Sequence, residues 1–105
     1  MEDFRIIYKI LRILQNAMDL EEFDVKELSA EALGLTVPKW SRMMAILLKE
    51  GYISGGQTWN SMGCSYPRVS LTRPELTMKG LEYLEENRLM KKAAGLAKGI
   101  IETAL

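Results

Sequence analysis

The chain contains no histidine and a single cysteine, Cys64, among its 105 residues. Without histidine there is no Ser-His-Asp triad, no imidazole acid or base, and no histidine metal site. One cysteine excludes an internal disulfide and a thiolate zinc site. The phosphate-binding patterns GxxxxGKS, GxxxxGKT and GxGxxG are also missing. These absences predict a protein that is not an enzyme and that holds no metal and no other cofactor.

Long apolar runs are absent as well, because no stretch approaches the roughly 20 residues that a membrane-spanning helix needs. The N-terminal sequence MEDFRIIYK lacks the basic start and the small-residue cleavage site of a signal peptide. We therefore expect a cytoplasmic protein with no membrane partner. Nothing in the sequence indicates a small-molecule ligand.

Excess charge of either sign is also missing, since 14 Lys and Arg residues balance 14 Asp and Glu residues. A neutral chain is not a strongly electrostatic nucleic-acid binder as a whole. The charges are unevenly distributed, however. Residues 1–35 carry eight acids and four bases. Residues 36–74 carry one acid and five bases, which are Lys39, Arg42, Lys49, Arg68 and Arg73.

Residues 1–20 contain a predicted first helix, which runs from about Phe4 to Met18 with Asp3 as its N-cap. Its polar residues form one narrow stripe, so its apolar face is much wider than the ~100° that contact with one core requires. We expect this helix to be covered on two sides, by its own domain and by another helix or a subunit.

After the acidic connector DLEEFDVKEL, residues 29–51 predict a helix-turn-helix. Ser29 can cap a short helix that Gly34 ends, and Thr36 can cap a longer helix that ends at Gly51. The residues of the longer helix that should face the core are Trp40, Met43, Met44, Leu47 and Leu48. The residues expected to lie away from the core are Lys39, Ser41, Arg42, Ala45 and Lys49.

Residues 52–76 predict a β-hairpin, or wing. A strand is expected at 52–54, an uncharged glycine-rich tip at 55–67, and a returning strand at 68–72. Pro74 belongs at a sheet edge or a bend, because it cannot donate a backbone hydrogen bond. A helix-turn-helix followed by a hairpin is the winged-helix order.

Residues 77–105 predict the C-terminal helices, with Thr77 as a cap. Leu81 and Leu84 lie on one side of a helical wheel, whereas the apolar residues of 89–105 lie on the other. We therefore expect a bend or break near Asn87, with residues 89–105 packed on the first helix or used in a homodimer. Residues 1–105 should form one mainly α winged-helix domain with a small antiparallel β-hairpin and helical extensions at both ends.

Three blocks together resemble the YjcQ-like family: EDFRIIYKIL, LGLTVPKWSRMMAILLKEGYISG and LTMKGLEYLEENRLMKKAAGLAKG. These are small winged-helix proteins of Gram-positive bacteria and their phages or prophages. The shorter blocks LLKEGYIS and LTMKGLEYL also look like the general pattern of winged-helix transcription regulators. The resemblance implies a winged-helix fold, and it implies no particular activity.

By analogy with the larger winged-helix class, the expected function is that of a DNA-binding, transcription-regulator-like protein. Its third helix would enter the major groove of double-stranded DNA. The expected helix contacts are Lys39, Ser41, Arg42 and Lys49. Arg68 and Arg73 would hold the flanking backbone. Weaker contacts from the wing would involve Gln57, Trp59 and Asn60.

Each of these contacts has a structural alternative. The bases of the helix can form a solvated surface, Arg68 and Arg73 can protect edge strands from aggregation, and Trp59 can fold back onto its hairpin. A second function is compatible with the same sequence. The chain would then be a protein–protein interaction module that keeps the winged-helix fold without binding DNA. Homodimerisation through the first and last helices fits either function.

Overall fold

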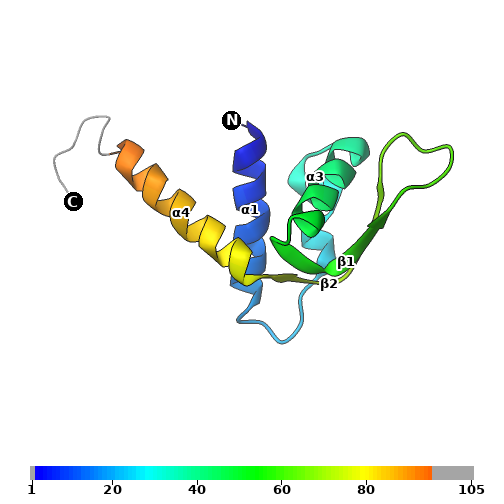
Figure 1. Cartoon of the computed structure of the whole chain (residues 1–105). Helices are drawn as coiled ribbons and strands as arrows, with labels where there is room; N and C mark the ends of the chain where they lie inside the picture. The colour runs from blue at the N-terminus through cyan, green and yellow to red at the C-terminus, as the bar shows by residue number, and fades with distance from the viewer. Residues whose placement is uncertain (1, 96–105) are drawn as a thin grey trace.

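The computed structural model describes the backbone of residues 2–95 and the side chains of residues 2–88. Figure 1 shows the first helix between two others, with a β-hairpin along the base of the helices and its turn projecting to one side. The elements in chain order are α1 (Glu2–Ala17), the 3-10 helix η1 (Val25–Leu28), α2 (Ala30–Leu33), α3 (Val37–Lys49), β1 (Ile53–Trp59), β2 (Arg68–Leu76) and α4 (Met78–Gly95).

Helix α1 starts earlier than the sequence predicts. It begins at Glu2, so Asp3 lies inside its first turn, and the prediction of Asp3 as the N-cap is wrong. Acidic residues in a first turn interact favourably with the helix dipole. The side that faces the core is fully packed, whereas Phe4 is 57% exposed. The buried residues of α1 are Ile10, Leu11 and Leu14.

The predicted caps of the helix-turn-helix are confirmed. The side chains of Ser29 and Thr36 each accept a backbone N–H from the first turn of the helix that follows. Gly34 ends α2 in the left-handed conformation, with φ of 70°. Helix α3 ends at Lys49, two residues before the predicted end at Gly51.

The 3-10 helix η1 lies within the acidic connector, where the sequence predicts no helix. Asp24 caps it by accepting the backbone N–H of Lys26 at 3.0 Å. Its last residue, Leu28, is fully buried and also accepts a hydrogen bond from the indole Nε1 of Trp40 at 2.6 Å. Since this bond orients Trp40 toward the core, the prediction that Trp40 is a core residue holds.

The hairpin strands are longer than predicted. Strand β1 continues through two glycines to Trp59, and β2 continues past Pro74 to Leu76. Gln57 and Trp59 therefore lie in a strand, rather than in the tip as predicted. Asn60 follows the strand directly.

An irregularity in the hairpin accommodates Gly55 and Pro74. Between the paired residues Ser54 and Gly56 of β1, the antiparallel register shifts. Gly55 has φ of 85°, and a Cβ there would collide with the carbonyl of Arg73. Pro74 lies in the same irregular segment, where the regular pairing is interrupted, and its side chain is buried.

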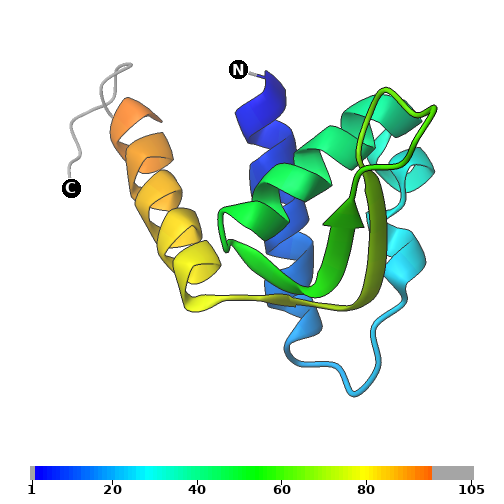
Figure 2. The ribbon, with the colours of Figure 1, turned by 45° about the vertical axis from the view of Figure 1, so that its right-hand side comes forward.

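Helix α4 runs without interruption from Met78 to Gly95, so the predicted break near Asn87 is wrong. The amide of Asn87 donates to the carbonyl of Tyr83, one turn earlier, at 2.8 Å, and this bond keeps its polar group within the helix. Figures 1 and 2 show α4 diverging from α1 along its length. One core therefore does not have to bury both apolar sets of this helix, which are Leu81 with Leu84 and the apolar residues from 89 onward. The apolar residues from Leu89 onward lie outside the described side chains.

The core joins almost every element. Strand β2 adds partly buried residues to it, and α3 packs against both strands. The fully or nearly fully buried cluster is Ile10, Leu11, Leu14, Leu28, Leu33, Met44, Leu47, Ile53 and Leu84. The result is a mainly α fold with one antiparallel hairpin in a winged-helix-like arrangement, as predicted. None of the helices within residues 2–95 combines the length and apolarity needed to cross a membrane.

Candidate nucleic-acid interface

One face of α3 is open to solvent, and we call it the α3 face. Its members are spaced by three, four and three residues, which places them on the same side of a helix. Ile46 lies among the three cations and is 54% exposed. No acidic residue occurs between Val37 and Lys49. The α3 face consists of Lys39, Arg42, Ile46 and Lys49.

Ser41 does not belong to this face, and the prediction that Ser41 and Ala45 lie on the exposed side of the helix is wrong. The exposed fraction of Ser41 is 3%, and that of Ala45 is 4%. Helix α3 packs against the hairpin as well as against the core, so a second side of the helix is covered. Small residues fit where this second side approaches the hairpin, and helical periodicity alone does not reveal such a contact.

Lys39 forms an ion pair with the first turn of α1. Its Nζ lies 2.7 Å from Oδ1 of Asp3, and both side chains remain about half exposed. Such exposed pairs contribute at most about 1 kcal/mol to stability. A phosphate could therefore displace Asp3, although the carboxylate lowers the positive charge that Lys39 offers to DNA.

Arg42 connects the α3 face with the wing. Its guanidinium donates to the carbonyl of Ser65, in the hairpin turn, at 3.1 Å. This bond leaves the remaining guanidinium donors available, because arginine carries five N–H groups. The bond between Arg42 and Ser65 also shows that the wing turn lies beside the predicted recognition helix.

The other predicted basic contacts are exposed. In the part of the chain that the structure describes, the side chains of Lys49 and Arg68 have no hydrogen-bond or ion-pair partner. Arg68 lies opposite Trp59 in the hairpin register. Trp59 is 48% exposed, and Gln57 and Asn60 are exposed as well. The wing thus offers a cation beside an aromatic ring.

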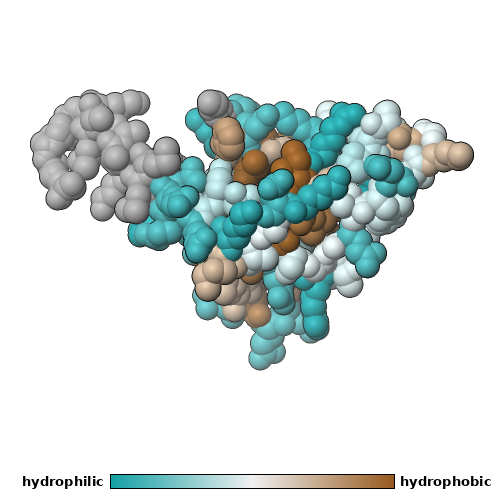
Figure 3. Space-filling view, viewed as in Figure 1, coloured by the Kyte–Doolittle hydropathy of each residue, from teal (hydrophilic) through white to brown (hydrophobic). Residues whose placement is uncertain are grey.

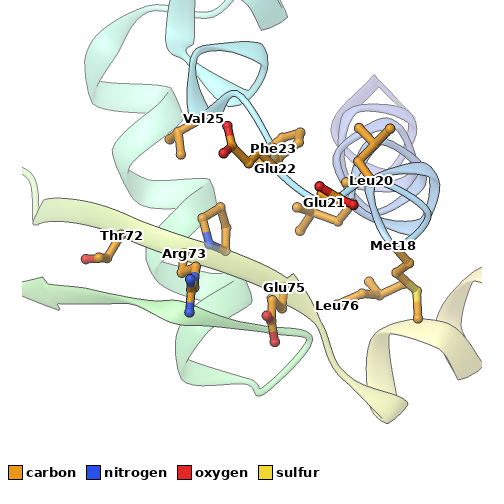
Figure 4. A pocket seen from close by; sticks show the side chains of 13 residues that line it. Met18, Leu20, Glu21, Glu22, Phe23, Val25, Thr72, Arg73, Glu75 and Leu76 are labelled. Atoms are coloured by element: carbon orange, nitrogen blue, oxygen red, sulfur yellow. The ribbon is translucent and has the colours of Figure 1, made fainter.

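Arg73 lies in a different environment from the other bases. It lines a groove of about 580 Å³ between the end of α1, the connector and β2. Figure 4 shows Glu21 and Glu22 on the connector side of this groove and Arg73 and Glu75 on the β2 side. Three carboxylates against one guanidinium repel phosphate, so this groove is a poor place for a DNA backbone. No metal-binding cluster of three His, Cys, Asp or Glu side chains occurs among the described residues.

Two residues of this region are not identified by the sequence patterns. Ile46 could have been found from its spacing, since it lies four residues after Arg42 and three before Lys49. Asp3 could not, because the ion pair joins residues 36 positions apart.

Comparison with known proteins adds one match. The model of the family described as YjcQ protein matches residues 8–103. The chain belongs to the YjcQ family. No curated protein and no solved structure matches it. The YjcQ match includes the whole α3 face and the whole wing, whereas Asp3 lies before its first residue.

Proposed function

We propose that this member of the YjcQ family binds double-stranded DNA through α3, in the manner of winged-helix transcription regulators. The observation that carries the proposal is the α3 face, where the second helix of a helix-turn-helix itself contributes three cations and no carboxylate to its open side, although Asp3 of α1 pairs with Lys39 there. Phosphate contacts from such a helix set its position, while base contacts give specificity. Arg42 is the best candidate for a base contact, because arginine can donate two hydrogen bonds to guanine.

The wing supports the same proposal. Arg68 and Trp59 lie opposite each other on its two strands, and Arg42 links its turn to α3. A DNA duplex on the α3 face would pass beside these side chains. Arg73 is left out of the proposed interface because of the three carboxylates that line its groove.

The direct test is fluorescence anisotropy with a labelled random-sequence duplex at low and at physiological salt. We expect binding at low salt that weakens steeply as salt is added. Each phosphate contact contributes a slope of about −0.9 to log K against log salt concentration. Absence of binding at low salt would refute the proposed function.

Asp3→Asn is expected to bind the same duplex more tightly. The change removes the carboxylate that competes with phosphate for Lys39. Because an exposed ion pair is worth at most about 1 kcal/mol, affinity should rise by up to about fivefold.

Glu85→Gln is the matched control for this change. Glu85 also forms an exposed ion pair, with Arg88 on α4, and its substitution removes one negative charge as well. Equal gains in the two variants would show that net charge, and not the pair at Lys39, controls affinity.

A second candidate function is protein–protein interaction without DNA. Apolar exposure in the hairpin favours it, since Met62 in the turn is 99% exposed and Trp59 is about half exposed. An apolar interface would persist as salt rises, whereas phosphate binding would not. Measuring the binding of a protein partner over the same salt series therefore distinguishes the two candidate functions.

A homodimer through α1 and α4 remains a further proposal. The two helices enclose a groove of about 470 Å³, lined in part by Tyr8, Arg12, Leu81 and Arg88. A symmetric dimer of DNA-binding units would contact half-sites about one helical turn, or ~10 bp, apart.

A further inference from the structure

Ile46 occupies the middle of the α3 face. On a helical wheel it lies 20° from Lys39 and 40° from Arg42, at 100° per residue. Both of its neighbours in the chain are buried, Ala45 at 4% and Leu47 at 1% exposure, whereas Ile46 is 54% exposed. An apolar side chain therefore lies on the side of α3 that the proposed function turns toward the bases.

The chemistry of isoleucine limits what it can contact there. Its side chain has no hydrogen-bond donor or acceptor, so it cannot pair with the polar edges of bases. Burying it against those edges would leave their donors and acceptors without partners, which costs free energy. In the major groove the thymine C5-methyl group is the apolar feature that distinguishes base pairs. Contact with that methyl group removes both apolar surfaces from water.

The surrounding cations are arranged to allow this contact. Arg42 is linked to the wing turn through Ser65, and Lys39 is linked to α1 through Asp3. Both long side chains thus extend toward neighbouring elements on the two sides of α3. Figure 3 shows apolar surface over α1 and α3 that is bordered and crossed by hydrophilic side chains. The middle of the α3 face is left to Ile46.

We propose that Ile46 recognises thymine through its C5-methyl group, so that the preferred DNA of this protein carries an A·T pair at the centre of each contact. The inference rests on the proposed DNA binding through α3. It adds a base preference that the cations alone do not supply, because phosphate contacts are the same for every sequence.

Two alternating duplexes test the proposal, one of dA and dT and the other of dA and dU. They differ only by the methyl group in the major groove. The wild-type protein should bind the dA–dT duplex about fourfold more tightly for each methyl group buried, as expected for one methyl group removed from water. Ile46→Ala should bind both duplexes with nearly equal affinity and with an unchanged salt slope.

Val37→Ala is the matched control, because Val37 is equally exposed, at 53%, but lies opposite the α3 face on the helical wheel. This variant should keep the wild-type preference for dA–dT. Equal binding of the two duplexes by the wild type would overturn the inference, and so would a preference that survives in Ile46→Ala. Failure to bind either duplex at low salt would refute the proposed function itself.

Discussion

Arg42→Glu combined with Lys49→Glu is expected to abolish detectable DNA binding, even at low salt. Both residues belong to the α3 face, and both side chains are exposed. A charge pair at close range is worth about 1 kcal/mol in water, and reversal replaces that attraction with a similar repulsion. Two reversals then cost about 4 kcal/mol, or roughly a 1,000-fold loss of affinity. Anisotropy with the random-sequence duplex measures this loss.

The matched control reverses two bases elsewhere, Lys26→Glu in η1 and Arg88→Glu in α4. Both side chains are exposed, and the change in net charge is the same. This control should lose much less affinity than the variant of the α3 face. An equal loss would indicate that net charge governs binding, and unchanged binding in Arg42→Glu/Lys49→Glu would exclude α3 as the interface. Circular dichroism should confirm that all variants are folded.

Local chemistry made much of this fold predictable from the sequence. Ser29, Gly34 and Thr36 determine the helix-turn-helix through hydrogen bonds and backbone conformation within a few residues. The presence of a hairpin was predictable, because the alternation of apolar and polar residues that is typical of a strand appears after a glycine-rich segment. Its full length was not, since β1 continues through two glycines, residues that weaken a strand, as a strand paired with β2.

The candidate site was less predictable, because its details depend on distant contacts. Helical spacing identifies Lys39, Arg42 and Lys49, but not how many sides of α3 are covered, so Ser41 was assigned to the wrong side. The charge available at Lys39 depends on Asp3, 36 residues earlier in the chain. Such a contact carries no periodic signal along the sequence.

Gly55→Ala is expected to destabilise the protein more than Gly63→Ala. Gly63 is the glycine of the hairpin turn at which an added Cβ would meet nothing. Gly55 has φ of 85°, which costs a residue with a Cβ about 1–2 kcal/mol. The new Cβ would also collide with the backbone carbonyl of Arg73. Because a backbone atom cannot rotate away, the strands must separate, and overpacking of this kind adds about 1–3 kcal/mol. Urea unfolding followed by circular dichroism measures the change.

Gly63→Ala separates the two causes of this loss. Gly63 has φ of 80°, almost the same as Gly55, and its Cβ would meet nothing within 4 Å. This variant should therefore lose only the conformational cost, about 1–2 kcal/mol. A larger loss in Gly55→Ala means that the close approach of β1 and β2 fixes the register, and with it the position of the wing beside α3. Equal losses would mean that the hairpin opens at Gly55 at little cost, and that Arg42 alone would then have to hold the wing turn against α3.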